Sequence, residues 1–454
     1  MIEIYLLLTA CVILGSMAVS YRRTRDPLSP LITFTPMLLY VYAFHPFVIH
    51  SNPQFISFFP HPEDREFVFI VNLISVAAFC AGASYFRHSS SDNQSFQILD
   101  LDASMRVRRN FFQLSLVLGV MASLSFWWMV YQSGGPLKLL RQNKPFMVSA
   151  SGYIGEMPML TYPAVLLLAA AWQGRQLNLG RVLMALLIAS PQLSWAIIGK
   201  RRGTIFLIGA TLAAFWYLVR NKKPNWKMIV GGVGMLGLLL LFVAAHRSQG
   251  LLEALGADSQ SNLTDTLAGS RLTAGDEFVS SSATILASRH NNHHYWGLRF
   301  FAMFVVRPIP SFLWESKWDD LGVGFMKSQA GQAGMTETQW DLAVGFNPLM
   351  GSAGGFVSDA YLEWAWGGPV ACFVLGFGFS WLWKQWVTHG GVWTVIYVEA
   401  MILTVYLPSQ SLGAWAYRFA LIAVPTAFVF WLFAPNRRRK RSRLPPPPIP
   451  VQTF

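Results

Sequence analysis

The stretch "GKRRGTIF" places three adjacent cations, Lys200, Arg201 and Arg202, between two long apolar runs. Guanidinium groups bind phosphate oxygens through forked hydrogen bonds, so clustered cations at one end of a helix bundle can form a site for an anionic lipid head. The alternative is that each charge only extends to the lipid headgroups. Three such charges together favour the phosphate site.

Two carboxylates and a histidine cluster could supply a general base. Asp359 and Glu363 are four residues apart in "GGFVSDAYLEWAWGGP", which puts both on one helix face, and we expect them near the positive N-terminus of that helix. Asp359 could instead cap the helix or neutralise arginines. His294, with His290 and His293 beside it, is the third candidate, because imidazole titrates near neutrality. No Cys or carboxylate stands at ligand spacing around these histidines, so no metal site is predicted.

These groups must be positioned by membrane-spanning helices. The chain has 454 residues, is 53% hydrophobic and 13% charged, and contains apolar runs of about 20 residues, the length that spans a bilayer. The runs are continuous rather than alternating, which indicates helices and excludes a barrel. The net charge of +13 lies largely in short connections and in a basic C-terminal stretch, a distribution typical of membrane anchoring rather than nucleic-acid binding.

About eleven spans are predicted from the apolar runs and their punctuation. They lie near 2–20, 30–49, 67–86, 111–131, 158–172, 182–199, 203–219, 228–245, 356–383, 391–407 and 416–434. Lys and Arg concentrate in alternate connections, and the positive-inside rule makes that side cytoplasmic. We therefore expect an N-terminal bundle of about eight spans (1–245), a long outer segment (246–355), a C-terminal bundle of about three spans (356–434) and a basic, proline-rich cytoplasmic tail (435–454).

The outer segment contains an apolar stretch, 296–306, that is too short to span and is interrupted by Arg299. This pattern predicts short interfacial helices. We expect Tyr295, Trp296 and Trp314 to anchor at the interface or to stack on sugar rings.

Several stretches resemble the oligosaccharide repeat-unit polymerases, that is, the Wzy-type O-antigen polymerases. In "SDAYLEWAWGGP" an acidic residue precedes a tyrosine and a glycine-punctuated apolar helix. Asp359, Tyr361 and Gly368 match that pattern, and Ala365 stands where glycine is common. "RPIPSFLWESKW" resembles the proline-containing segment of the family, and "KRRG" its basic turn between two middle spans. Arg141 to Gly152, "RQNKPFMVSASG", has the family's spacing of an arginine and a glycine in an outer loop.

The resemblance implies a metal-independent glycosyltransferase of the bacterial inner membrane, without a cofactor and with its long segment in the periplasm. It would transfer a growing glycan from an undecaprenyl-diphosphate carrier to a carrier-linked repeat unit. Its partners would be membrane lipid and the chain-length regulator and flippase of the same pathway, with no nucleic acid. The diphosphate would be bound by Arg141, Lys200, Arg201, Arg202, Arg247, Arg299 and Arg307, and Asp359, Glu363 or His294 would be the base.

Three other functions stay open at this point. A ligase that passes the same glycan to another acceptor needs nearly the same site. A flippase or other transporter of lipid-linked oligosaccharides is disfavoured, because the predicted spans are almost free of ionisable residues. A structural membrane protein would leave the outer cations unexplained.

Overall fold

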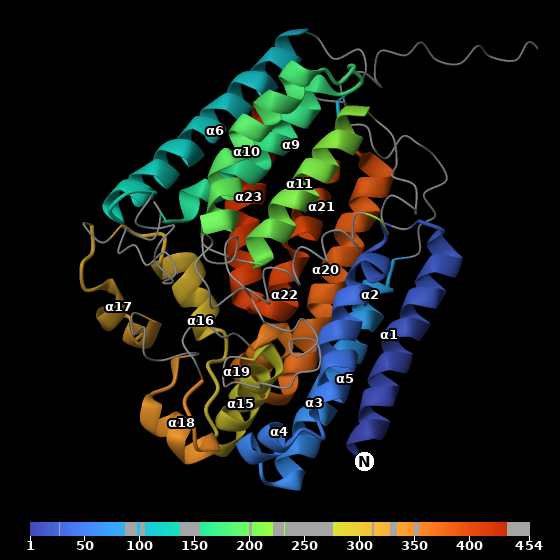
Figure 1. The fold of residues 1–454 in the computed structure, drawn as a ribbon, viewed down its shortest axis with the longest axis vertical. Helices are drawn as coiled ribbons and strands as arrows, with labels where there is room; N and C mark the ends of the chain where they lie inside the picture. Colours follow the sequence, from blue (N-terminus) through green and yellow to red (C-terminus); the bar gives the residue numbers. More distant parts are fainter. Residues whose placement is uncertain are drawn as a thin grey trace, which may run out of the picture.

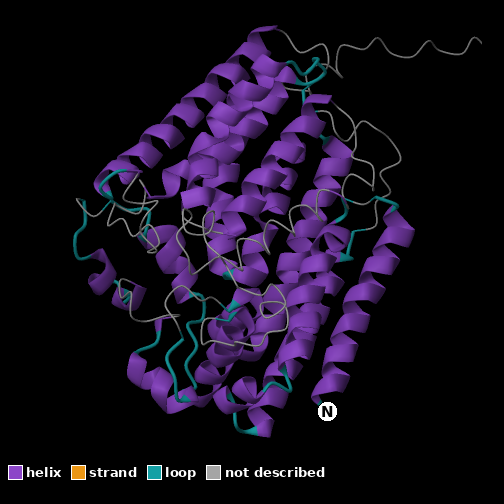
Figure 2. Ribbon diagram, in the orientation of Figure 1, coloured by secondary structure: helices purple, strands orange, loops and turns teal. Residues whose placement is uncertain are grey.

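The computed structural model describes residues 1–26, 28–86, 98–99, 105–136, 155–198, 202–220, 231, 276–310, 313–326, 334–348 and 354–433. Every regular element within these ranges is helical (Figures 1 and 2). Seven helices are long and apolar enough to cross a membrane, and three shorter apolar helices accompany them. These helices agree with an all-α, multi-pass membrane protein. Apart from residue 231, the predicted span 228–245 lies outside the described residues, so the count of eleven stays a prediction.

Helices in the first half of the chain run alternately up and down the bundle in the view of Figure 1. They are α1 (Ile2–Thr24), α2 (Pro30–Leu39) continued by a π-helical turn (Tyr40–Phe44) and α3 (His45–Ile49), α4 (Pro53–Phe58), α5 (Pro62–Ala83), α6 (Met105–Gln132), α9 (Thr161–Trp172) after a 3-10 turn (Met157–Leu160), α10 (Leu179–Ile198) and α11 (Arg202–Arg220). Proline opens α2, α4 and α5, where the missing N–H is not needed.

Short helices of residues 276–348 lie at the lower end of the bundle in Figure 1. They are α15 (Glu277–His290), α16 (Leu298–Phe301) continued by a π-helical turn (Ala302–Val306), α17 (Lys317–Asp320), a 3-10 turn (Gly324–Met326) and α18 (Glu337–Val344). Asp276 begins α15 by accepting hydrogen bonds from the N–H groups of Phe278 and Val279.

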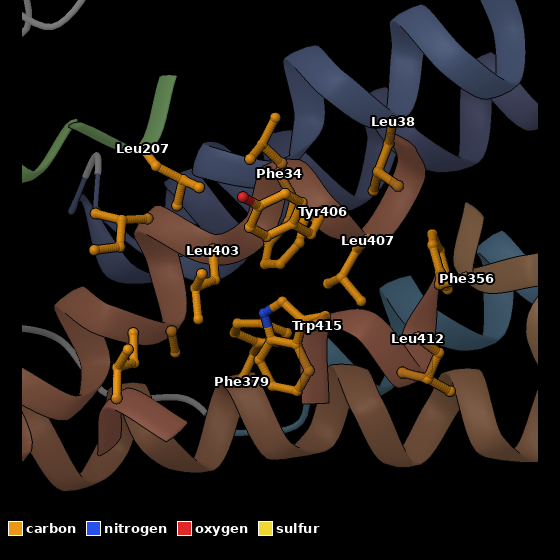
Figure 3. Packing of buried hydrophobic residues seen from close by; sticks show 14 of the residues in the cluster. Phe34, Leu38, Leu207, Phe356, Phe379, Leu403, Tyr406, Leu407, Leu412 and Trp415 are labelled. Carbon is orange, nitrogen blue, oxygen red and sulfur yellow. The ribbon is translucent and has the colours of Figure 1, made fainter. Parts of the chain in front are cut away.

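The last helices pack among the first ones and share their core. They are α19 (Gly355–Trp364), a 3-10 turn (Ala365–Gly367), α20 (Gly368–His389), α21 (Val392–Ile402), a 3-10 turn (Leu403–Val405), α22 (Tyr406–Ser409) and α23 (Leu412–Phe433). Helix α20 packs along α5, and α23 packs against α6 and α9. Phe379 of α20 lies between Phe34 of α2 and Trp415 of α23, with ring centroids 4.7 and 5.0 Å away (Figure 3).

Basic residues occur at the ends of several helices that point upward in Figure 1. Arg22 and Arg23 are in the last turn of α1, Arg106 is in the first turn of α6, and Arg220 ends α11. The side of the membrane on which these ends lie stays a prediction.

Helices α5 and α20 touch backbone to backbone at two glycines. A Cβ added to Gly82 would overlap the carbonyl oxygen of Phe373, and a Cβ added to Gly376 would overlap that of Phe79. Small residues allow this close approach, which gives dispersion contacts along the whole crossing. The pair fixes α20 relative to the N-terminal helices.

Glu399 of α21 is fully buried in the bundle. Its Oε1 lies 2.5 Å from the hydroxyl of Thr426 in α23, and the same hydroxyl lies 3.0 Å from the carbonyl oxygen of Ile422. The Thr426 hydroxyl donates to Glu399 and also lies close to its own helix backbone, so this contact joins α21 to α23.

The predicted span 356–383 falls within the candidate span Gly355–His389, but the helix is interrupted there between α19 and α20. Trp364 ends α19, and Ala365 has φ 50° and ψ −128°, outside the helical region. Glu363 therefore lies in the last turn of α19, although the sequence suggested a place near a helix N-terminus. An L-residue at this positive φ is strained by about 1–3 kcal/mol, and glycine is the residue that adopts it freely.

Replacing Ala365 with glycine is expected to raise the free energy of unfolding by about 1 kcal/mol, because the relief of strain exceeds the added chain entropy. Chemical denaturation in detergent would measure the change. Ala365→Val is the matched comparison and should destabilise, since a β-branched residue tolerates positive φ least. A destabilised Ala365→Gly variant would contradict this account of the break.

Candidate functional site

Helix α19 ends at Trp364, and a segment distant in the sequence caps the carbonyl groups of its last turn. Helix C-termini lack partners for their last carbonyls. Here the N–H of Tyr295 donates to the carbonyl of Leu362 at 3.2 Å, and the N–H of Trp296 donates to that of Glu363 at 2.7 Å. The segment 294–299 is thereby held along the C-terminal half of α19. This contact brings Arg299 next to Asp359 and Glu363.

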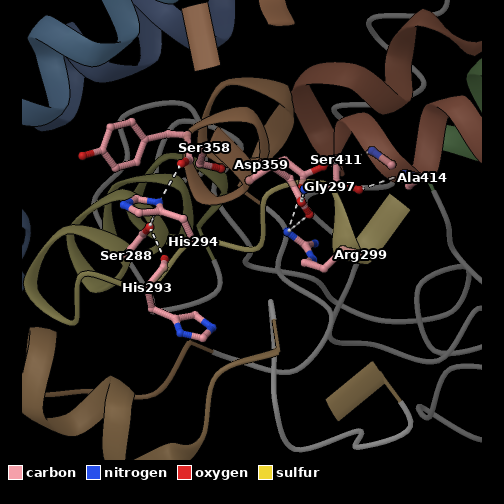
Figure 4. Close-up of polar contacts among 12 residues, drawn as sticks. Ser288, His293, His294, Gly297, Arg299, Ser358, Asp359, Ser411 and Ala414 are labelled. Carbon is pink, nitrogen blue, oxygen red and sulfur yellow. Dashed lines mark hydrogen bonds and ion pairs between the residues drawn. The ribbon is translucent and has the colours of Figure 1, made fainter. Parts of the chain in front are cut away.

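Arg299 contacts both carboxylates of α19, and Figure 4 shows it beside Asp359. Its Nη1 is 2.8 Å from Oδ1 of Asp359 and 3.4 Å from Oε1 of Glu363. The N–H of Gly413 donates to Asp359 Oδ2 at 3.0 Å, and the N–H of Gly297 donates to Glu363 Oε2 at 2.9 Å. One arginine contacts both side chains, which requires that the two carboxylates share a helix face.

This triad is almost closed to solvent. Glu363 is fully buried and Asp359 is 5% exposed. Burial of the Arg299 guanidinium opposes its charge, but Asp359 and Glu363 outweigh that effect and raise the pKa of Arg299. The Arg299 guanidinium thus pairs with both carboxylates. Each carboxylate also accepts a hydrogen bond from one backbone N–H group. The three groups are organised to hold each other in place.

The two ring nitrogens of His294 differ in their contacts: Nδ1 is held by neighbouring oxygens, and Nε2 can accept a proton. Its Nδ1 is 3.0 Å from Ser288 Oγ and 3.2 Å from the carbonyl oxygen of Tyr361. Ser288 donates its only hydrogen to the carbonyl of His293 at 2.8 Å, so both neighbours of Nδ1 can only accept. Nδ1 must therefore carry the hydrogen, and Nε2 of the neutral ring is a proton acceptor. The ring is partly exposed, with Trp296 and Tyr361 beside it.

Tyr295 and Trp296 are neighbours in the sequence but differ in exposure to solvent. Tyr295 is buried and stacks on Phe325 with centroids 4.9 Å apart, and burial raises its pKa to about 12, so its phenol stays protonated. Trp296 is 70% exposed. It begins an exposed apolar strip that continues with Phe301, Phe304 and Val305. Trp296 remains a candidate for anchoring or stacking, whereas Tyr295 is part of the core.

Arg307 forms a second, more open pair. Its Nη2 is 3.2 Å from Glu156 Oε1, and its guanidinium carbon lies 4.5 Å from the ring centroid of Tyr417 in α23. The other predicted anion ligands Arg141, Lys200, Arg201 and Arg247 lie outside the described residues. Arg202 begins α11, but its side chain is not described.

The sequence missed several residues that the structure brings to this end of the bundle. Ser288 fixes the tautomer of His294, Glu156 pairs with Arg307, and Gly413 donates to Asp359. Only Arg418 had a visible signal, an arginine inside the predicted span 416–434. Its guanidinium contacts the side-chain oxygen of Gln410 and lies over the ring of Tyr406.

Within the described ranges, no group of three or more His, Cys, Asp or Glu side chains is arranged to hold a metal ion. Metal independence stays a prediction. The chain matches no family model, no curated protein and no solved structure.

Proposed function

We propose that this protein polymerises lipid-linked oligosaccharide repeat units, transferring the growing glycan from a diphosphate carrier to a sugar hydroxyl of the next unit. The observation that supports it best is His294, whose Nδ1 is held by Ser288 and Tyr361 while Nε2 is the nitrogen left to accept a proton, in the segment that also supplies Arg299 to Asp359 and Glu363. Asp359 also belongs to the stretch that resembles the Wzy-type polymerases.

In the proposed reaction the acceptor hydroxyl gives its proton to His294 Nε2, and its oxygen bonds to the anomeric carbon of the growing glycan. The bond from that carbon to the diphosphate oxygen breaks, and the carrier diphosphate leaves with the bonding electrons. Preorganised cations stabilise the charge that develops on it, which needs no metal. Arg299 acts as a positioning residue, because its charge is already matched by two carboxylates.

We place the site on the periplasmic face and the basic helix ends on the cytoplasmic face of a bacterial inner membrane. The upper helix ends in Figure 1 carry Arg22, Arg23, Arg106 and Arg220, and the positive-inside rule assigns such ends to the cytoplasm. The exposed apolar strip from Trp296 to Val305 would then rest at the outer lipid interface.

The test is an assay on purified protein in detergent with lipid-linked repeat units and no nucleotide sugar. We expect ladders of increasing glycan length that persist in chelator, because no step uses a metal. Transfer only to an acceptor that is not a repeat unit would indicate a ligase and contradict the proposal. Movement of intact lipid-linked units across liposomes without new bonds would indicate a transporter and also contradict it.

A further inference from the structure

Arg418 carries a positive charge inside a candidate membrane span, and no carboxylate among the described residues pairs with it. It belongs to α23, one of the seven long apolar helices, and is partly buried. Arg289, Arg299 and Arg307 each face a carboxylate, at 3.5, 2.8 and 3.2 Å. Within the described ranges, Arg418 contacts only the neutral Gln410 side chain and the Tyr406 ring. A charge in a span needs a counter-charge, and ionisable residues there mark ligand sites.

The contacts of Arg418 leave its hydrogen-bonding edges open to an anion. Its guanidinium carbon is 4.2 Å from the ring centroid of Tyr406, so the aromatic face holds the flat side of the group. The N–H donors point outward from the edge of a guanidinium plane, and Gln410 occupies one of them. An incoming oxyanion can replace the amide oxygen of Gln410 and form a forked pair of stronger bonds.

The neighbours of Arg418 that the structure describes are neutral, and the nearby Arg307 is itself paired with Glu156. Tyr417, the preceding residue, holds the guanidinium of Arg307 over its ring. Tyr162 of α9 is close enough to sense the charge of Arg418, and its hydroxyl donates to Gln192 of α10 at 3.1 Å. Helix α11 contacts the 3-10 turn 403–405 just before Tyr406. The described neighbours of Arg418 are thus aromatic rings and the neutral Gln410 and Tyr162 side chains.

We infer that Arg418 binds a phosphate oxygen of a diphosphate lipid, displacing Gln410. The identity of the ligand as the glycan carrier depends on the proposed function, whereas the anion site itself does not. A phospholipid headgroup offers the same phosphate chemistry, and the experiment must separate these two sources.

The experiment measures binding of three probes to the purified full chain in detergent: undecaprenyl diphosphate, phosphatidylglycerol and inorganic pyrophosphate. Native mass spectrometry or thermophoresis gives each dissociation constant. We expect undecaprenyl diphosphate to bind the wild type most tightly and Arg418→Ala to weaken it about tenfold or more, the scale of one lost charged hydrogen bond. Arg418→Lys should restore part of the affinity, because it keeps the charge but not the fork.

Two further variants serve as controls. Arg220 also stacks on an aromatic ring, that of Trp216 at 4.2 Å, but it ends α11 on the opposite side of the bundle. Arg220→Ala should leave binding unchanged. Gln410→Ala removes the internal competitor and should bind the diphosphate at least as tightly as the wild type. The melting temperature of each variant shows whether it is folded, and Arg418→Gln keeps much of the side-chain volume if alanine does not fold.

The outcomes decide the inference in each case. Unchanged diphosphate binding in folded Arg418→Ala or Arg418→Gln protein would overturn the site. Phosphatidylglycerol binding that is as tight and as dependent on Arg418 would overturn its assignment to a diphosphate. Carrier binding that depends on Arg418 in a protein that makes no glycan ladders would support the site and contradict the polymerase instead.

Discussion

Arg299→Ala is expected to lower the free energy of unfolding by about 3–5 kcal/mol, the largest stability effect of any single substitution proposed for this protein. Removing the guanidinium leaves Asp359 and Glu363 facing each other inside the fold, with Glu363 fully buried. Two neighbouring carboxylates without a cation repel each other and lack solvation. Chemical denaturation in detergent would measure the loss.

A triple substitution tests whether the loss of stability comes from unmatched charges. Arg299→Met combined with Asp359→Asn and Glu363→Gln removes all three charges and should recover most of the stability, because the cost comes from the unmatched charges. Arg307→Ala is the matched control, since its pair with Glu156 is partly exposed and should contribute only about 0–1 kcal/mol. Equal destabilisation by Arg299→Ala and Arg307→Ala would contradict the special role of the buried triad.

His294→Ala is expected to slow glycan polymerisation by about 10²–10⁴-fold, the range of a lost general base. The ring is partly exposed, so the variant should fold, and its melting temperature checks this. The rate of ladder formation with purified protein measures the effect. His294→Gln should be equally slow, because its amide can form hydrogen bonds but cannot accept a proton.

Three variants separate His294 from its neighbours. His293→Ala is the matched control; its ring lies against Tyr295 rather than α19 and should be dispensable for the rate. Asp359→Asn and Glu363→Gln keep the shape of the triad and should reduce the rate less than His294→Ala. Normal ladders from His294→Ala, with none from Asp359→Asn, would assign the base to Asp359 instead.

Much of the fold follows from one-dimensional patterns in the sequence. Continuous apolar runs of spanning length predicted ten helical regions that are found in the described chain. The one-face spacing of Asp359 and Glu363 was visible because helical periodicity is local. The break at Ala365 was not, since the residue alone does not show that its φ is 50°; the only hint was that glycine is common there in the resembling family.

The candidate site is less predictable because it depends on contacts between distant segments. Nothing in the sequence states that Tyr295 and Trp296 cap α19, and that contact decides which residues face Arg299. The tautomer of His294 depends on Ser288 and on the hydroxyl's other partner. Glu399 was passed over because a single acid in an apolar run gives no sign of Thr426, its partner on another helix.

The glycine crossing between α5 and α20 makes the site sensitive to substitutions far from it. Any side chain at Gly82 or Gly376 must push the two helices apart, because a Cβ at either position meets a backbone oxygen that cannot rotate away. Helix α20 is joined to α19 by only the three residues 365–367, so a shift of α20 is passed on to Asp359 and Glu363. A screen for inactive variants should therefore recover these two glycines along with the charged residues. Such variants would lose activity through displacement of the triad, without altering any group that takes part in the reaction.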